Sequence, residues 1–461
     1  MKREGKGAQV MSGANTTGTA RRTGRAVIVL GALATLAGCA ERETILPGER
    51  LALRAVLDGP AAVSEQPAPT GAPAPLSLPA PRVNAGWTHG TGSPLYRPEH
   101  PALSHPLAPV WSADIGEGDS RRARIATDPV VADGRVFTID AASTLRATGA
   151  DGAPLWSLDL VPARDRPGEA IGGGLAYGGG TLFATTAYGR LLAVDPATGA
   201  VRWDQKLDAT GTGDPLYRDG LVYLVAGDTT AWAIEAADGR VRWRNEGVGD
   251  VRNLAGGPAP AAAGGRVAFA FGTGEIQTVF AEGGLPRWSA FVAGRRAGTA
   301  IGLVDDITGG PVIAEGRLYA ANAAGRLAAI DLESGERLWT AEEGAFDTIW
   351  PAGGSLFLVN DRNELLRLDA RDGRRVWAVE LPRYTEMRPR RRAAIHAQHG
   401  PVLAGGRLIV AGGDGILRIF DPEDGALLET RDLPGGATAT PAVADETLYI
   451  VTRDGRLHAF R

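Results

Sequence analysis

Internal repetition constrains the fold of this chain more than any other feature. In GGPVIAEGRLYAANAAGRLAAIDLESGERLW (309–339), apolar segments of four to six residues alternate with turns that contain glycine. Segments this short, each closed by a turn, predict strands joined by tight hairpins, and none is long enough for a typical helix. Four such strands form one antiparallel sheet. Because the unit recurs along the chain, the sequence predicts a repeat architecture.

Eight copies of this unit follow one another. They begin near Asp128, Gly172, Gly213, Gly256, Gly309, Ile349, His399 and Thr440. Each of the first seven copies ends on a glycine that is followed four residues later by a marker residue. The markers are Trp156, Trp203, Trp243, Trp288, Trp339, Trp377 and, in the seventh copy, Glu429. Markers spaced 38 to 52 residues apart are typical of four-stranded propeller blades.

The eighth copy, at 440–461, has only three strands, which would leave an exposed sheet edge. An isolated fourth-strand sequence, PVWSADIG with Trp111, stands before the first copy at 109–116. We expect it to complete the last blade. The predicted fold over 108–461 is therefore all-β: an eight-bladed β-propeller of four-stranded antiparallel blades, closed by an N-terminal strand.

The recurring residues have a structural explanation. A tryptophan on an outer strand can bury its ring against the neighbouring blade while its N–H reaches a backbone carbonyl. We predict this role for Trp111 and the six tryptophan markers. An aspartate four residues before the glycine can accept hydrogen bonds from its own turn. The aspartates in this position are Asp195, Asp331, Asp369 and Asp421.

The N-terminal residues are typical of an exported protein. Arginines precede AVIVLGALATLA (26–37), which is too short to span a bilayer and has the order of a secretory signal, predicted here as 1–38. LAGC (36–39) resembles the lipobox of bacterial lipoproteins. That resemblance implies lipidation of Cys39, the only cysteine, and Ala40 after it implies the outer membrane. Residues 39–107 are rich in Pro and Ala and predict a solvated tether.

Charge argues against one class of partner. Without residues 1–38 the chain has 43 Lys and Arg against 52 Asp and Glu, a net charge of −9. This balance does not favour nucleic acid or an anionic membrane surface.

AVDPATGAVRW (193–203) resembles the repeat of pyrroloquinoline-quinone (PQQ) enzymes. Those enzymes hold the quinone on the propeller axis with calcium, a catalytic carboxylate and often two adjacent cysteines. This chain has no cysteine pair, no oxygen-rich calcium motif and no phosphate-binding loop. His396 and His399 lack a third ligand nearby, so we predict a solvated loop there and not a zinc site. We expect no catalytic residue, cofactor or metal; a PQQ-dependent periplasmic dehydrogenase is the alternative.

The layout of the chain resembles that of the BamB family, lipoproteins of the outer-membrane β-barrel assembly machine. This layout is a signal, a lipobox, a polar tether and an eight-bladed PQQ-like propeller. ETILPGER (43–50) and NAGWTHG (84–90) add to the likeness. The resemblance implies a non-enzymatic periplasmic scaffold, lipid-anchored in the outer membrane. It would bind the POTRA domains of a BamA-like barrel-forming subunit and assist folding and insertion of outer-membrane proteins. We expect a monomer outside that complex. A lipoprotein propeller with another, cell-wall-related partner is a third hypothesis.

In that family two loops on one face contact the POTRA domains. The matching stretches are GDVRNLAGGPAP (249–260) and GLVDDITGGP (302–311), which flank one blade. In the first stretch Leu254 takes the leucine position. Ala255 stands where an arginine is expected, and Arg252 substitutes for it.

In the second stretch Asp306 takes the first acidic position, while Thr308 stands at the second and Asp305 compensates. The candidate partner-binding residues are thus Arg252, Leu254, Asp305 and Asp306.

Connections from an outer strand to the next inner strand all lie on one propeller face. The longest are 161–171, 245–255, 293–308 and 383–398, and long loops on a rigid scaffold often carry function. The last has five arginines, which suit an acidic partner or lipid headgroups, or form a solvated charge run.

Overall fold

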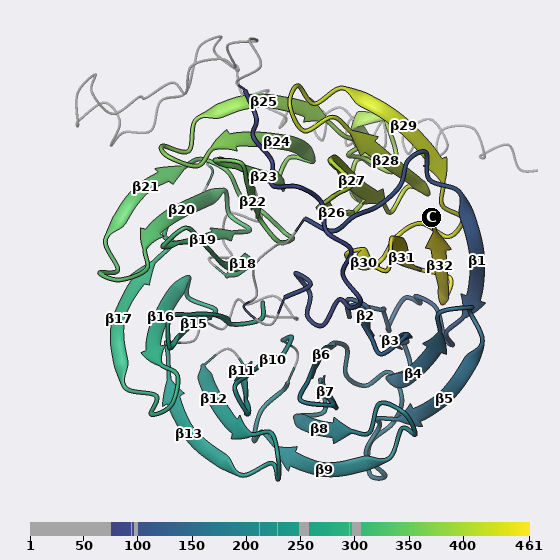
Figure 1. The fold of residues 1–461 in the computed structure, drawn as a ribbon, viewed down its shortest axis with the longest axis vertical. Coiled ribbons are helices and arrows are strands. Elements are labelled where there is room, and N and C mark those ends of the chain that lie inside the picture. Colours follow the sequence, from purple (N-terminus) through teal and green to yellow (C-terminus); the bar gives the residue numbers. More distant parts are fainter. Residues whose placement is uncertain are drawn as a thin grey trace, which may run out of the picture. The chain divides into compact units, whose positions relative to one another are not determined.

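The computed structural model describes residues 75–93, 95, 100–211, 213–227, 229–248, 258–294, 296 and 306–461. The predicted signal, Cys39, Arg252, Leu254 and Asp305 lie outside the described residues. The described strands form eight four-stranded antiparallel sheets arranged as blades around an axis (Figure 1). The predicted eight-bladed propeller is confirmed. In this part of the chain no helix is long and apolar enough to cross a membrane.

Blades 1 to 4 each follow the chain from the inner strand to the outer strand. Blade 1 contains β2 (Val130–Ala132), β3 (Arg135–Ile139), β4 (Thr144–Gly149) and β5 (Pro154–Asp159). Blade 2 contains β6 (Gly173–Gly178), β7 (Thr181–Thr186), β8 (Arg190–Val194) and β9 (Val201–Lys206). Blade 3 contains β10 (Leu216–Arg218), β11 (Leu221–Ala226), β12 (Thr230–Glu235) and β13 (Val241–Glu246). Blade 4 contains β14 (Ala261–Ala263), β15 (Arg266–Ala270), β16 (Glu275–Phe280) and β17 (Pro286–Phe291).

Blades 5 to 7 repeat the pattern, and blade 8 combines both ends of the ring. Blade 5 contains β18 (Ile307–Ala314), β19 (Arg317–Asn322), β20 (Arg326–Asp331) and β21 (Arg337–Ala341). Blade 6 contains β22 (Trp350–Ala352), β23 (Ser355–Val359), β24 (Glu364–Asp369) and β25 (Arg375–Glu380). Blade 7 contains β26 (Gln398–Ala404), β27 (Arg407–Gly412), β28 (Ile416–Phe420) and β29 (Leu427–Asp432), and the 3-10 turn η2 (Pro389–Arg391) precedes it. Blade 8 contains β30 (Ala442–Ala444), β31 (Thr447–Thr452), β32 (Arg456–Phe460) and β1 (Pro109–Asp114).

The ring closes as the sequence predicts. Strand β1 pairs antiparallel with β32, and Trp111 lies opposite Ala459. The backbones of Ala108 and Arg461 exchange two hydrogen bonds of 2.9 Å. The edge that blade 8 would otherwise expose is therefore covered, as an aggregation-resistant sheet requires.

Seven tryptophans join neighbouring blades. Each indole N–H donates to a backbone carbonyl in a turn of the next blade, which confirms their predicted structural role. The N···O distances lie between 2.9 and 3.3 Å for Trp111, Trp156, Trp203, Trp243, Trp288, Trp339 and Trp377. The glycine of each receiving turn is needed for close approach: a Cβ on Gly199, whose φ is +75°, would lie 2.7 Å from the ring of Trp156.

The predicted aspartates cap these turns. Asp195 Oδ1 accepts hydrogen bonds from the backbone N–H groups of Ala197 and Thr198, both at 3.0 Å. Asp331, Asp369 and Asp421 accept equivalent bonds from the residue two positions later.

Blade 7 carries Glu429 in place of tryptophan, and ring closure explains why. The next blade has no turn there, because its outer strand comes from the N-terminal side. The Glu429 Oε1 atom instead accepts a 3.1 Å hydrogen bond from the backbone N–H of Leu107. Arg431 pairs with Glu429 at 2.9 Å and donates to the Leu107 carbonyl at 2.7 Å. At the other joints an indole N–H donates to a backbone carbonyl. Here the partner is a backbone N–H, so the side chain must be an acceptor such as the Glu429 carboxylate.

Residues 75–107 differ from the solvated tether that the composition predicts. In Figure 1 this segment, drawn in purple and dark blue, crosses the ring. Trp87 is buried, pairs with Val131 through two backbone hydrogen bonds, and stacks on Trp350 with ring centroids 6.2 Å apart. Elsewhere the segment bonds to strand ends and turns of blades 2, 4, 7 and 8. Apolar burial and backbone pairing therefore fix this Pro-rich chain onto one face.

His89 lies within the predicted solvated tether but is not solvated. Its ring is fully buried, and Nε2 accepts a 3.1 Å hydrogen bond from the backbone N–H of Tyr217. Burial lowers the pKa of His89 to about 3. A neutral ring thus ties the N-terminal segment to blade 3.

Candidate partner-binding face

Two faces of the ring carry different connections. Strands run outward in antiparallel order, so the outer-to-inner connections share a face with the turns between second and third strands. The N-terminal segment contacts the opposite face, where turns join first and second strands, such as 405–406 and 445–446. The described residues of this segment thus leave the face with the outer-to-inner connections free, and that face is the candidate partner-binding face.

The two predicted contact loops begin on a common support. We call the connection 247–260 the first loop and the connection 292–306 the second loop. Val248 N–H donates to Glu275 Oε2 at 3.1 Å, and Thr273 Oγ1 donates to the Val248 carbonyl at 2.8 Å. Val292 N–H donates to the Gly274 carbonyl at 2.9 Å. The 271–275 turn of blade 4 thus holds the start of both loops.

The far ends of the loops also lie close together. A Cβ on Gly310 would lie 2.6 Å from the Cβ of Pro258, so the chain after the second loop packs against the end of the first. The two loops flank blade 4, as their spacing in the sequence predicts. The structure places their described starts at one turn and their described ends next to each other.

Blade 5 fixes the second loop. Asn322 is fully buried, and its Nδ2 donates to the carbonyls of Val292 and Gly294 at 3.2 and 3.0 Å. Arg296 N–H donates to the Ala324 carbonyl at 2.7 Å. These bonds come from the turn between β19 and β20, so the loop leaves a rigid base.

Asp306 is the one predicted contact residue that the structure describes. It is only 6% exposed and directly precedes β18. Its backbone carbonyl accepts a 3.3 Å hydrogen bond from Ala323 N–H. A side chain with so little exposed area suits the base of the loop better than its contact surface.

Three acidic residues next to the inner strands were missed by the sequence analysis. Asp128, Asp214 and Asp347 precede the inner strands of blades 1, 3 and 6. Asp347 accepts hydrogen bonds from Thr440 Oγ1 at 2.9 Å and from Gly400 N–H at 2.7 Å. The repeated Asp-Pro pair, in DPVV (128–131) and DPLY (214–217), was the available signal.

Burial dominates the electrostatics of these acids. It raises the pKa of Asp214 to about 7, with the Asp347 carboxylate adding to the effect. Burial also raises the pKa of Asp128 well above its usual value, and the carboxylates of Asp214 and Asp347 reinforce this. A nearby carboxylate and desolvation both disfavour the charged form of a carboxyl group, so both raise its pKa.

His399 was predicted in a solvated loop but lies in β26, beside the axis. Burial lowers its pKa, while the carboxylates of Asp347 and Asp119 oppose the shift. Within the described ranges, no three or more His, Cys, Asp or Glu side chains are placed to hold a metal ion.

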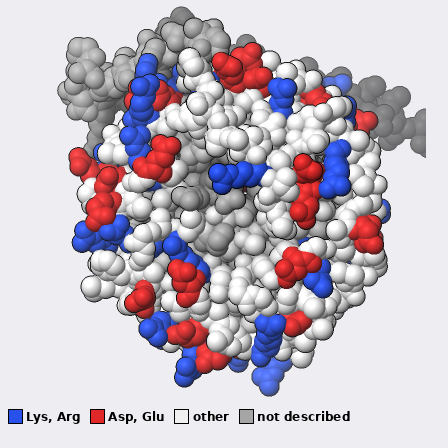
Figure 2. Space-filling model, in the orientation of Figure 1, with Lys and Arg blue, Asp and Glu red and all other residues white. Residues whose placement is uncertain are grey.

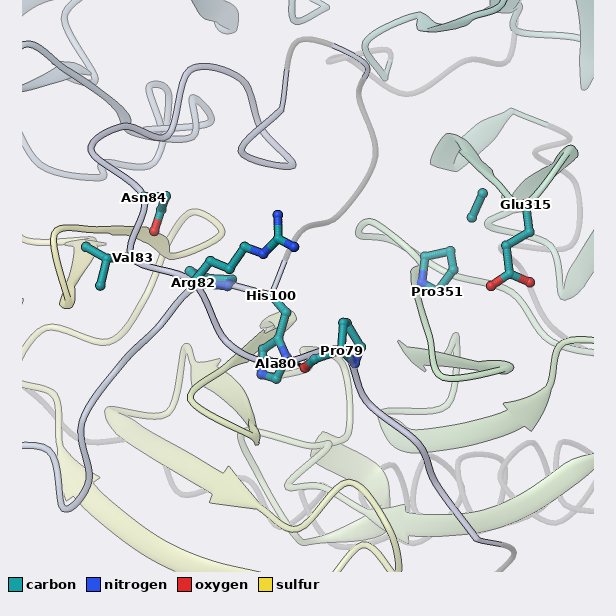
Figure 3. A pocket seen from close by; sticks show the side chains of 10 residues that line it. Pro79, Ala80, Arg82, Val83, Asn84, His100, Glu315 and Pro351 are labelled. Carbon is teal, nitrogen blue, oxygen red and sulfur yellow. Dashed lines mark hydrogen bonds between the residues drawn. The ribbon is translucent and has the colours of Figure 1, made fainter.

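The opposite face has a pocket of about 500 Å³. Figure 3 shows Arg82 and His100 of the N-terminal segment on one side and Glu315 and Pro351 of blades 5 and 6 on the other. His100 is engaged at both ring nitrogens, with the Pro79 carbonyl at 2.7 Å and with Gly406 N–H at 2.9 Å. Its role is thus to hold the segment.

In Figure 2 acidic and basic side chains are interspersed around the face in view.

Comparisons with known proteins agree on one family. The family model described as outer membrane protein assembly factor BamB matches residues 141–379 and 384–461. The assembly factor BamB of Yersinia pestis is 25% identical over 379 residues, covering 80% of this chain and 92% of the relative. The one of Escherichia coli K12 is 25% identical over 366 residues, covering 78% and 90%.

Solved structures show the same fold. The crystal structure of BamB from Moraxella catarrhalis aligns with a TM-score of 0.63 at 19% identity, covering 77% of this chain and 99% of that one. Quinohemoprotein alcohol dehydrogenase from Comamonas testosteroni aligns with a TM-score of 0.61 at 15% identity, covering 82% and 80%. At these identities the likeness concerns the propeller alone.

Proposed function

The chain belongs to the family of the outer membrane protein assembly factor BamB, and on this premise we propose that it is a non-enzymatic scaffold for outer-membrane protein assembly. Lipidated at Cys39, it is held at the periplasmic face of the outer membrane. There it binds the POTRA domains of a BamA-like barrel-forming subunit and assists folding and insertion of barrel proteins.

One observation carries the choice of surface. The first and second loops start from the same 271–275 turn and end against one another at Pro258 and Gly310. Because their described ends are held together, both loops extend from one part of this face, where a single partner could contact both. Arg252, Leu254 and Asp305 provide two charges and one apolar anchor there, a composition that suits a polar-rimmed interface. Buried Asp306 positions the second loop.

Capture from detergent-solubilised membranes tests this proposal. The lipidated full-length chain should recover a POTRA-bearing barrel protein. We expect the combined variant Leu254→Glu and Asp305→Lys to recover at least about tenfold less, because central interface residues dominate binding energy. Asp306→Asn keeps the shape of the buried side chain and should have a smaller effect.

The matched control is Glu282→Lys, an exposed charge reversal on the opposite end of blade 4. It should recover the barrel protein as the unaltered chain does. Absence of any POTRA-bearing protein from the wild-type capture would overturn the proposal. If PQQ and calcium instead gave the purified chain dye-reducing activity, the dehydrogenase alternative would stand.

A further inference from the structure

A turn of blade 6 forms direct hydrogen bonds with the second loop, although the two are far apart in the sequence. Arg296, in the second loop, donates to both carboxylate oxygens of Asp361 at 2.9 and 3.1 Å. Asp361 lies in the turn 360–363 between β23 and β24 and is 8% exposed. Burial acts to raise the pKa of Asp361, but Arg296 and the Gly344 N–H together hold it below its usual value. The pair is thus a charged, bidentate contact.

The same turn holds a second connection. Asn363 Nδ2 donates to the carbonyls of Pro382 and His396 at 3.1 and 2.8 Å, and Leu381 N–H donates to the Asn363 carbonyl at 2.8 Å. Pro382 and His396 are the two ends of the arginine-rich connection between blades 6 and 7. We call residues 382–398 the basic hairpin and the turn 360–363 the clasp. The clasp therefore links the second loop to the basic hairpin.

The basic hairpin is ordered at its stem. Thr385 N–H donates to the Ala394 carbonyl at 3.1 Å, and His396 N–H donates to the Arg383 carbonyl at 2.8 Å. The guanidinium groups of Arg383 and Arg392 lie over the ring of Tyr384, at 5.2 and 5.0 Å from its centroid. Such cation–π contacts stabilise the stem and account for two of the five arginines.

The tip carries the other three. Arg388, Arg390 and Arg391 are exposed around η2, and Met387 beside them is 72% exposed. Among the described side chains no carboxylate forms an ion pair with these three arginines. Three arginines without an ion pair and one exposed apolar side chain thus lie together at this tip, and the only acidic residue in the hairpin is Glu386.

We propose that the partner-binding surface continues from the second loop across the clasp onto the basic hairpin, where an acidic surface of the same protein partner meets Arg388, Arg390 and Arg391. The inference rests on the proposed function. Arginine and methionine are enriched in protein interfaces, and arginine is frequent among residues that dominate binding. The clasp fixes the hairpin relative to the second loop, which matches a folded partner of fixed shape better than a fluid lipid surface.

Charge neutralisation tests the acidic partner surface. In the lipidated full-length chain, Arg388, Arg390 and Arg391 are all changed to Gln, and affinity for the purified barrel-forming subunit is measured in detergent at low and high salt. We expect roughly tenfold weaker binding at low salt, mainly through a slower association rate, and a smaller difference at high salt. Changing Arg240, Arg371 and Arg374 to Gln removes the same charge from the opposite face and should leave affinity unchanged.

The clasp is tested by a double-mutant cycle. Asp361→Asn removes the charge opposite Arg296 without adding bulk, and it should weaken binding less in the triple-Gln background than in the wild-type background. If the losses of binding free energy from Asp361→Asn and from the triple-Gln change were additive, Asp361 would act only on the fold. The proposed role of the clasp in binding would then be wrong.

Other outcomes separate the two proposals. If the wild-type chain binds the subunit and the triple variant binds equally well at low salt, the inference is wrong while the proposed function stands. If the triple variant loses only binding to vesicles of anionic phospholipid, the hairpin is a lipid contact and the inference is also wrong. If the wild-type chain does not bind the subunit, the proposed function fails first.

Discussion

Aspartate has two opposite roles in this chain, and the surroundings decide which. At the partly exposed Asp195, hydrogen bonds from Arg202 and Thr198 lower the pKa to about 2, so the carboxylate is charged at neutral pH and caps its turn. At Asp214 burial raises the pKa to about 7, so ionisation costs free energy. Both residues lie in turns with similar local sequence. The difference comes from the depth of the site and from neighbouring carboxylates.

Asp214→Asn should stabilise the folded chain in a pH-dependent way. The pKa of Asp214 is raised on folding from 3.8 to about 7, so its ionisation penalises the folded state increasingly from pH 4 to pH 7 and constantly above pH 7. We expect the variant to be more stable by about 1–3 kcal/mol at pH 8 and equal to wild type near pH 4. Denaturant unfolding across this range measures it.

The same exchange at an exposed position, Asp432→Asn, is the control. An Asp214→Asn offset that did not change with pH would contradict the assigned cause.

At the scale of elements, the N-terminal segment shows how packing overrides composition. The described residues between 75 and 107 contain little regular structure, yet Trp87 and His89 are buried and the backbone bonds to several blades. The segment behaves as a strap across one face, opposite the contact loops. Its described residues contact only the face opposite the candidate partner-binding face.

Trp87→Ala should destabilise the chain by about 3–5 kcal/mol, because it removes a fully buried ring and leaves a cavity beside Trp350. Thermal or denaturant unfolding measures the change. Val83→Ala lies in the same segment, where the side chain is 64% exposed, and should change stability by less than about 0.5 kcal/mol. Equal stability of Trp87→Ala and wild type would show that the strap is not bound in solution.

At the scale of the whole molecule, closure of the ring depends on a local exchange of hydrogen-bonding roles. Seven joints use an indole N–H and a turn carbonyl, and the joint between blades 7 and 8 uses Glu429 and the Leu107 N–H. The ring thereby keeps every one of these backbone groups paired where the two ends of the chain meet. Leu107 is 1% exposed, so its N–H has no access to water as a substitute partner.

Glu429→Ala should therefore cost about 1–3 kcal/mol of folding free energy, the range for a buried donor left without an acceptor. Glu429→Gln keeps an oxygen at the same place and should cost clearly less. Hydrogen exchange of β1 and β32 should rise in the alanine variant before that of other blades. Uniform exchange across all blades would argue against a role in closure.

Much of this architecture was predictable. Short apolar segments, glycine turns and tryptophan spacing predict eight blades, and the three-stranded last repeat predicts closure by residues 109–116. The position of the two contact loops beside blade 4 also follows from the repeat order. The clasp was not predictable, because Arg296 and Asp361 are 65 residues apart and meet only after two blades have packed. Nor was the burial of Asp306, which depends on the neighbouring strands.

The sequence by itself determined the blade, the number of blades and the way the ring closes, because hairpins and turns depend on residues close together in the chain. Only the tertiary structure decided which residues end up buried on the axis, where residues 75–107 lie, and which loops are joined. Those outcomes depend on desolvation and on contacts between segments that the ring brings together from distant parts of the chain.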